Sequence, residues 1–286
     1  MKEIADDIFI ESSYAGVTLG AVCMRDGLIF IDAPLYAKDA QSWRASLVKP
    51  VGSSDRLLVL LDEHLDRSAG AKAMKCTTIT HERAAQSLST RPSSSKPAGS
   101  KSGSLWELLD DLGTLHSIQP EITFTHSMAI NWSDEPIVLE QHTGPSKGST
   151  WASIPAQKVV FIGDTVLTGQ PPFLASADLE GWQETLSHLR SARYRDYIII
   201  SSRSQVITQE DVKAQSTLLK HVQRGLERMV QHNAGSAEME SLVSDLMKWF
   251  TPKNRKEEEM YKSRLSWGLL QCYNNNYHPG SVSADR

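Results

Sequence analysis

A chain of 286 residues is long enough for one large domain with a full hydrophobic core, or for one domain with an appendage. With 22% charged residues and a net charge of -4, the chain has no long-range basic field that would attract nucleic acid or an anionic membrane. Its three cysteines are far apart and form no CxxC pair, which argues against a disulfide framework or a cysteine zinc site. No secretory leader and no membrane-spanning apolar run are visible, so we expect a cytoplasmic protein.

The first elements of the chain have the pattern of strands. Residues 8–11, 17–24 and 28–32 are strand-like runs. The Arg25-Asp26-Gly27 segment between the last two runs has the chemistry of a hairpin turn. The chain therefore begins with short strands, of which at least two are joined as a hairpin.

A helix, a buried strand and a low-complexity loop come next. Apolar residues at helical spacing predict a helix over residues 38–48, and the continuous apolar run 56–61 predicts a strand that is buried on both faces. Residues 87–104 are rich in Ser, Lys, Pro and Gly, which is typical of a flexible loop. Ser104 and Glu107 have capping-box spacing, so we expect a helix to start after Ser104.

The second half of the chain repeats the theme of strands and helices. Its expected elements are strands over 122–124, 137–140 and 159–162, a helix over 181–193 and a buried strand over 197–200. From Gln209 onward the pattern is helical, with breaks near Asn233 and Pro252. Two β-rich halves that each carry helices predict an α/β protein, a four-layer sandwich over residues 1–207 followed by a C-terminal helical extension over 208–286.

Three strand ends carry landmarks in a fixed order. The segment Ile29–Asp32 is a strand that ends in Asp, the apolar run before Asp62 leads into a polar motif, and Val159–Asp164 is a strand that ends in Gly-Asp. This series resembles the metallo-β-lactamase superfamily over roughly residues 5–205. The resemblance implies a four-layer αββα metallo-β-lactamase-type sandwich, with a site for two divalent ions at one edge that activates a bridging water.

Most of the metal ligands that the resemblance implies are replaced in this chain. Of seven expected ligands, three keep the residue type of the family, namely His64, Asp66 and Asp164. The other positions of this vestigial site hold Asp62, Arg67, Pro145 and Arg203, each where the family has a histidine. The resemblance therefore implies a dinuclear site that is mostly lost.

The two arginines of the vestigial site stand around the second metal position. Arginine stays protonated and cannot ligate a metal, but its planar guanidinium pairs well with carboxylates. The retained Asp66 and Asp164 would be costly to bury together without a cation. We therefore predict that Arg67 and Arg203 replace the second metal ion electrostatically, through ion pairs with these two carboxylates.

The first metal position leaves two interpretations open. Asp62, His64 and Asp164 could hold one weakly bound zinc or other divalent ion, with His142 as a further ligand if its loop is shifted. In the other interpretation, Asp62 and His64 form only hydrogen bonds within an inherited loop, and no cofactor is bound. The second interpretation is the one that we expect.

Other reactive side chains have simpler interpretations. His81 follows a strand-like run and is expected at a strand end on the surface, whereas Cys23 and Cys76 are expected to be inert core thiols. The segment Gly144–Ser149, which has Pro145 in place of a histidine, is called the altered loop. Ser146 and Ser149 lie in it, but no paired base in the sequence identifies a serine nucleophile.

Three functions follow from this sequence. The first is a noncatalytic metallo-β-lactamase-type protein that binds a small molecule or a protein partner, but not nucleic acid or a membrane. The second is a hydrolase that uses a reduced, mononuclear zinc site formed around Asp62, His64 and Asp164. The third is a structural role for the aromatic-rich tail 208–286, including assembly into a homo-oligomer. The fold alone does not identify a substrate.

Overall fold

Two mixed β-sheets form the centre of the molecule. The computed structural model describes residues 1–51, 55–91, 102–109, 118–232 and 235–277. In spatial order, the first sheet consists of β1 (Lys2–Ala5), β2 (Ile8–Glu11), β3 (Leu19–Met24), β4 (Gly27–Ile31), β5 (Arg56–Val59), β6 (Thr77–His81) and β7 (Ile122–Phe124). The second consists of β13 (Gln205–Ile207), β12 (Ile198–Ser201), β11 (Val159–Phe161), β10 (Thr150–Ile154), β9 (Ile137–Gln141) and β8 (Ser127–Ile130). Strands β4 to β7 are parallel, as are β11 and β12.

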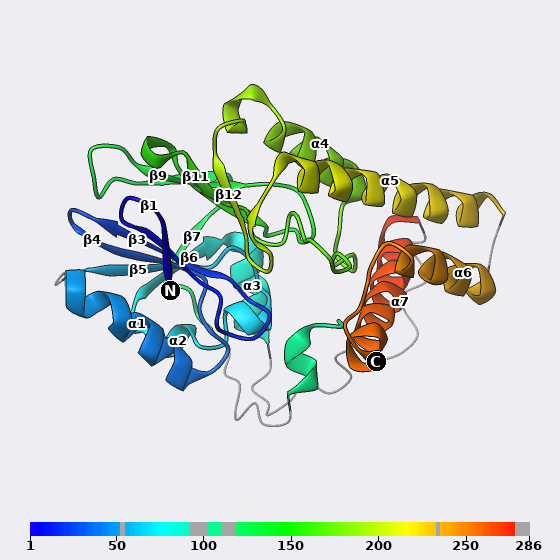
Figure 1. Ribbon diagram of the computed structural model, residues 1–286, viewed down its shortest axis with the longest axis horizontal. Helices are drawn as coiled ribbons and strands as arrows, with labels where there is room; N and C mark the ends of the chain where they lie inside the picture. Colours follow the sequence, from blue (N-terminus) through cyan, green and yellow to red (C-terminus); the bar gives the residue numbers. More distant parts are fainter. Residues whose placement is uncertain (52–54, 92–101, 110–117, 233–234, 278–286) are drawn as a thin grey trace.

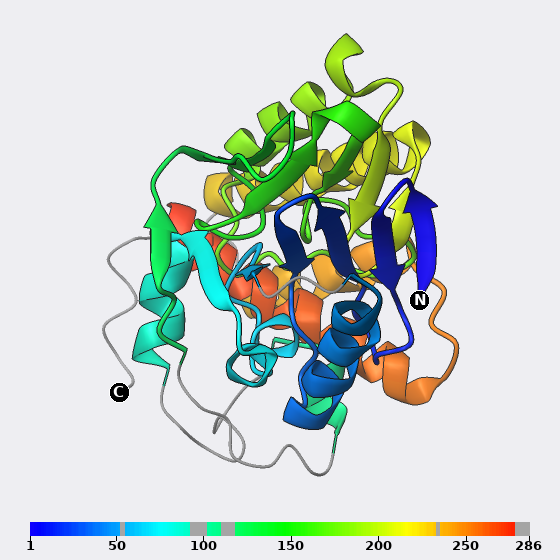
Figure 2. The same cartoon turned by 90° about the vertical axis from the view of Figure 1, so that its left-hand side faces the viewer.

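Helices cover the outer face of each sheet. The first sheet is covered by α1 (Ala37–Val51), α2 (Ala71–Met74) and α3 (Glu82–Thr90), and the second by α4 (Leu179–Leu189) and α5 (Gln209–Gln231). Figures 1 and 2 show these four layers, with α6 (Ser236–Met247) and α7 (Arg255–Tyr277) packed beside them. The short 3-10 helices are η1 (Leu65–Arg67), η2 (Leu105–Leu108), η3 (Pro155–Gln157) and η4 (Ala192–Tyr194).

The core divides into layers that match this architecture. Between the sheets, Ile29 of the first sheet and Phe161 of the second are fully buried in one hydrophobic cluster. Outside the second sheet, Trp182 of α4 shares one hydrophobic cluster with Leu226 of α5 and Leu265 of α7. The helical extension is therefore packed into the same core as the sandwich. None of the described helices has both the length and the hydropathy that a bilayer span requires.

The parallel strands bring several loops to one edge of the sandwich. Asp32 follows β4 and donates its backbone N–H to Val59 O, while Ile162 after β11 donates to Ile200 O. Thr150 N donates to Leu61 O at 2.8 Å and so joins the two sheets at this edge. Because the carboxyl ends of parallel strands lie side by side, residues that are far apart in sequence meet here.

Most of the predicted elements occur at the predicted places. The expected hairpin joins β3 and β4, and the helical region beyond Gln209 breaks into three helices near the two expected positions. The four-layer α/β sandwich with a C-terminal helical extension is therefore confirmed. Strands β1, β8, β10 and β13 were not predicted, since their sequences lack a clear period-two pattern.

Two local predictions around the Ser-rich segment are wrong in part. Residues 87–90 belong to α3 and not to the loop, because Ala84, Ala85 and Leu88 give this short helix a buried face. In the described residues 102–109, the 3-10 turn η2 and not an α-helix follows Ser104, whose side chain makes no capping hydrogen bond. The remainder of the predicted loop, residues 92–101, lies outside the described residues.

Replacing Gly20 with Ala should destabilise the fold. Gly20 lies on β3, and a Cβ atom there would lie 2.3 Å from the Phe161 ring of the opposite sheet. Overpacking of this kind costs about 1–3 kcal/mol. We therefore expect Gly20→Ala to lower the free energy of unfolding by about this amount in urea denaturation. Gly144→Ala is the control, since its Cβ would have its nearest contact at 3.8 Å; equal stability of the two variants would contradict the inter-sheet contact.

Candidate functional site

Carboxylates and arginines from four loops meet at this edge of the sandwich. Asp32 follows β4 and Asp62 follows β5, while Asp66 and Arg67 lie on η1. Asp164 follows β11, and Arg203 follows β12. All of these side chains are at most 3% exposed. We call this set of residues the arginine–carboxylate cluster.

Arg67 lies at the centre of the cluster and bridges three carboxylates. Its Nη1 donates to Asp32 Oδ2 at 2.6 Å, and its Nη2 donates to Asp62 Oδ2 at 2.5 Å. The same Nη2 lies 3.0 Å from Asp164 Oδ2. The guanidinium therefore joins β4, β5 and β11 of the two sheets. The expected pairing with Asp164 is present, whereas Asp66 is paired with the other arginine.

Arg203 forms the second bridge of the cluster. Its Nη1 and Nη2 donate to the two oxygens of Asp66 at 2.6 and 3.0 Å, a bidentate arrangement. Its Nε donates to Asp164 Oδ2 at 3.0 Å. The ion pairs that the sequence predicted for Arg203, with Asp66 and Asp164, are therefore both present.

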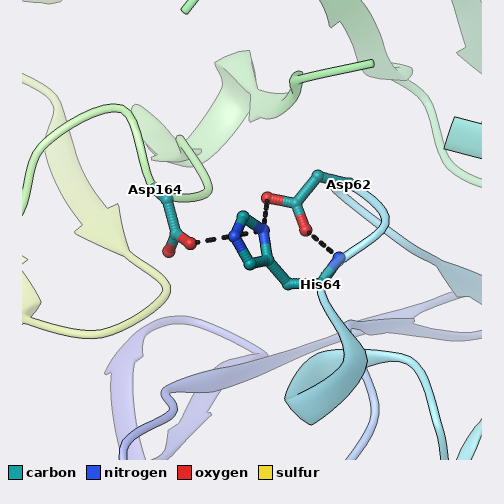
Figure 3. Close-up of side chains that lie close together, drawn as sticks. All are labelled: Asp62, His64 and Asp164. Carbon is teal, nitrogen blue, oxygen red and sulfur yellow. Dashed lines mark hydrogen bonds and ion pairs between the residues drawn. The ribbon is translucent and has the colours of Figure 1, made fainter. Parts of the chain in front are cut away.

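His64 faces the same carboxylates. Figure 3 shows its ring between Asp62 and Asp164. Its Nδ1 lies 3.0 Å from Asp62 Oδ2 and 3.5 Å from Asp164 Oδ2, and its backbone N–H donates to Asp62 Oδ1. The ligand atoms of these three residues all lie within 4.8 Å of one another. Asp62, His64 and Asp164, which the sequence grouped as one candidate metal position, therefore lie close together in the structure.

Charge within the cluster outweighs burial at Asp62, Asp66 and His64, whereas at Asp32 burial outweighs the charge of Arg67 and raises the pKa of the carboxyl. Burial alone would raise the pKa of Asp62, but the charges of Arg67 and His64 hold it well below its usual range. At Asp66, burial acts to raise the pKa of the carboxyl, but the charge of Arg203 lowers it. At His64, burial acts to lower the pKa of the imidazole, but the charge of Asp62 raises it. The charged forms of these groups therefore stabilise one another.

Asp32 is a member of the cluster that the sequence did not identify as a site residue. Its φ of +61° lies in the left-handed region, which is costly for a residue with a Cβ. Its carboxylate accepts hydrogen bonds from Leu61 N and Ser202 Oγ in addition to Arg67. The strained backbone therefore aims a buried carboxylate at Arg67. Its position at a strand end was visible in the sequence, but its contact with Arg67 was not.

Phe173 and the helical extension close the cluster on one side. The Phe173 ring lies 4.7 Å from the His64 ring and 4.7 Å from the Arg203 guanidinium carbon, both measured to its centroid. Arg264 of α7 stacks on the same ring at 4.2 Å. Arg264 also donates to the backbone oxygens of Gly103 and Pro171. Nothing in the sequence singled out Phe173 or Arg264, because these contacts join distant segments.

The altered loop lies between β9 and β10, and its side chains contact residues outside the arginine–carboxylate cluster. Pro145 is buried in this loop, and Ser146 Oγ donates to Glu63 Oε2 at 3.1 Å. His142 does not join the ligand group, since its ring stacks on Trp151 at a centroid distance of 3.8 Å. Burial, with smaller effects of nearby positive groups, lowers the pKa of His142 to about 3. The shifted-loop ligand that the sequence left open is therefore not supported.

The interpretation of His81 as a surface residue is wrong. The side chain is 2% exposed and lies at the junction of β6 and α3. Its Nδ1 accepts a hydrogen bond from Arg83 N, and its Nε2 lies 2.8 Å from Thr125 O. His81 is therefore a buried helix cap.

Cys23 and Cys76 are half-buried, and burial raises the pKa of both thiols to about 11.

Comparison with known proteins identifies the fold. No protein-family model and no curated protein sequence matches the chain. A metallo-β-lactamase from Pontibacter korlensis matches 77% of this chain with 97% of its own, at 17% identity and a TM-score of 0.58. The DIM-1 metallo-β-lactamase gives the same coverage of this chain and the same TM-score at 15% identity, over 95% of its own length. The chain has the metallo-β-lactamase fold.

One further structural match also covers the helical tail of this chain. The sec-alkylsulfatase Pisa1 from Pseudomonas sp. matches 99% of this chain at 10% identity and a TM-score of 0.67. The chain spans about half of that protein, since 51% of the alkylsulfatase is covered. The fold is thus shared with hydrolases, while identities this low say nothing about shared activity.

Replacing His142 should change how stability depends on pH. Between pH 6.5, its ordinary pKa, and about 3, the unfolded chain binds a proton at this residue that the folded chain does not. Stability is therefore lost as the pH falls, by about 1.4 kcal/mol per pH unit from this group. In urea titrations from pH 7 to pH 5, His142→Phe should lose less stability than the wild type. His126→Phe, at an exposed histidine, is the control; parallel curves for the wild type and His142→Phe would count against the buried neutral imidazole.

Proposed function

We propose that this chain is a noncatalytic metallo-β-lactamase-fold protein that binds a small molecule or a protein partner. In this proposal Arg67 and Arg203 take the place of metal cations. The observation that carries it is the pair of ion-pair bridges, in which each guanidinium contacts Asp164 and at least one further buried carboxylate. A self-association of the chain through α5 to α7 stays a prediction.

The charges of the cluster support this proposal. The cluster contains four carboxylates, and each forms an ion pair with an arginine. Buried carboxylates without a cation would be strongly unfavourable, whereas well-hydrogen-bonded pairs are tolerated. The two arginines, together with His64, therefore supply part of the positive charge that metal ions supply in a dinuclear site.

The residues at the first metal position do not fit a zinc ion while Arg67 keeps its contacts. Zinc needs ligand atoms about 2.0–2.2 Å away. Arg67 Nη2 already lies 2.5 Å from Asp62 Oδ2 and 3.0 Å from Asp164 Oδ2. A zinc ion bound to the same two oxygens would lie next to a permanently charged guanidinium, and the two cations would repel each other.

A mononuclear zinc hydrolase is the alternative. It is favoured by the short distances among the ligand atoms of Asp62, His64 and Asp164, and by similarity in fold to proteins named as β-lactamases and an alkylsulfatase. In this alternative Arg67 would have to move away from Asp62 and Asp164. Metal content and hydrolysis of a β-lactam or an alkyl sulfate ester discriminate between the two functions.

Removal of Arg203 should destabilise the protein strongly. Arg203→Met leaves the buried carboxylates of Asp66 and Asp164 with less positive charge, and breaking a buried pair costs about 3–5 kcal/mol. Adding Asp66→Asn should recover part of this loss, because it removes one of the unpaired charges. The measurement is the free energy of unfolding in urea.

The control for Arg203→Met is Arg25→Met. Arg25 also forms an ion pair, with Asp134, but its side chain is 65% exposed. Exposed pairs contribute little to stability, because water and salt screen them. If Arg203→Met proved as mild as Arg25→Met, the arginines would not be neutralising buried charge and the proposal would fail.

The purified protein should contain less than one zinc ion per chain after dialysis, and it should not hydrolyse a β-lactam or an alkyl sulfate ester. The reason is that Arg67 occupies the space between the carboxylates. Elemental analysis and a spectrophotometric hydrolase assay measure both quantities. Stoichiometric zinc, with activity that is lost in Asp62→Ala and in His64→Ala, would establish the alternative instead.

A further inference from the structure

A cavity opens beside the arginine–carboxylate cluster, at Glu63. It has a volume of about 590 Å³, within the range of small-molecule sites. Its wall combines Arg83 and Gln86 of α3, Lys147 of the altered loop, and Asn275 and Asn276 of α7. Figure 1 labels α3 and α7, the two helices that contribute to it. None of the described residues that line it is aromatic, and most of its lining is polar, which suits a hydrophilic ligand.

The two cations of this cavity lie on segments that touch each other. Gly148 packs directly on the first turn of α3, where a Cβ atom at Gly148 would lie 2.7 Å from Ala84 N. This contact joins the segments that carry Lys147 and Arg83, the residues next to Gly148 and Ala84. Within the described part of the chain, neither Arg83 nor Lys147 forms an ion pair. Two positive charges therefore stand on neighbouring segments without a carboxylate partner.

The two carboxylates that line the cavity are already engaged. Asp178 Oδ1 accepts a hydrogen bond from Gly181 N and caps α4, where the helix dipole also favours a negative charge. Glu63 Oε2 accepts a hydrogen bond from Ser146 Oγ, and the charge of Arg91 acts on Glu63 from nearby. The positive charge of Arg83 and Lys147 is thus left for a ligand.

The part of the wall that α7 contributes is fixed by hydrogen bonds. Asn275 Nδ2 donates to Ala175 O at 3.0 Å, and Asn276 Nδ2 donates to Ala177 O at 3.2 Å. These bonds fix the helix to the loop before α4 and leave both amide oxygens as acceptors. A ligand with hydroxyl or amine groups could therefore be held at this wall while its anionic group meets the cations.

We propose that this cavity binds a small hydrophilic molecule through a carboxylate or phosphate group held by Arg83 and Lys147. The inference rests on the binding role proposed above and names the class of its ligand. The net charge of the chain is -4, so the molecule as a whole does not attract anions. Binding of an anion must then come from these local cations.

Inorganic phosphate and citrate, titrated separately into isotope-labelled protein at fixed ionic strength, test this proposal by NMR. At least one of the two probes should give saturable shifts of the Ser87, Gly148 and Ala177 amides, and the probe that binds distinguishes a phosphate from a carboxylate ligand. The double variant Arg83→Gln, Lys147→Gln should bind that probe at least tenfold more weakly. The control Lys38→Gln, Lys220→Gln makes the same change of charge at exposed sites and should stay within twofold of the wild type.

Two results would overturn the assignment of this ligand class. One is that neither probe gives a saturable shift at the lining amides. The other is that both double variants weaken binding equally, which would indicate a general effect of charge. Either result, together with a strongly destabilised Arg203→Met, would remove the ligand class while leaving the noncatalytic function in place.

Discussion

The rest of the site depends on the buried guanidinium of Arg67. It contacts Asp32, Asp62 and Asp164, which follow three strands from two different sheets. Carboxylates buried this deeply require a cation, and a protein can supply it as a metal ion or as a side chain. A side chain has the advantage that its charge is always present, because an arginine stays protonated even when it is buried. In this chain the positive charge at the edge of the sandwich is thus part of the fold itself.

The arginine–carboxylate cluster also contacts Phe173 and, through it, the helical extension. Arg203 shares Asp164 with Arg67 and holds Asp66, and Phe173 covers Arg203 and His64. Arg264 then fixes α7 against the same ring, so the helical extension closes one side of the edge. The neighbouring cavity at Arg83 and Lys147 stays open, which separates a closed, ion-paired cluster from the place where we propose that a ligand binds.

The sequence could predict the parts of this arrangement that follow from order and charge. The pairing of Arg203 with Asp66 and Asp164 was predictable, since the motif order places them at one edge and opposite charges attract. The partner Asp32, by contrast, depends on a left-handed backbone residue, and Phe173 and Arg264 depend on packing between segments about 90 residues apart. The last residues of α3 were assigned to the loop because they share its Ser-rich composition.

The dependence of stability on free zinc tests most directly whether Arg67 stands where a metal ion would bind. A ligand that binds only the folded chain stabilises it by about 1.4 kcal/mol for each tenfold increase above its dissociation constant. We expect the free energy of unfolding of the wild type to stay constant from a chelated solution to excess zinc, while Arg67→Ala, with Asp62, His64 and Asp164 freed, gains a dependence on zinc. A wild type whose stability rises steadily with zinc would contradict this expectation.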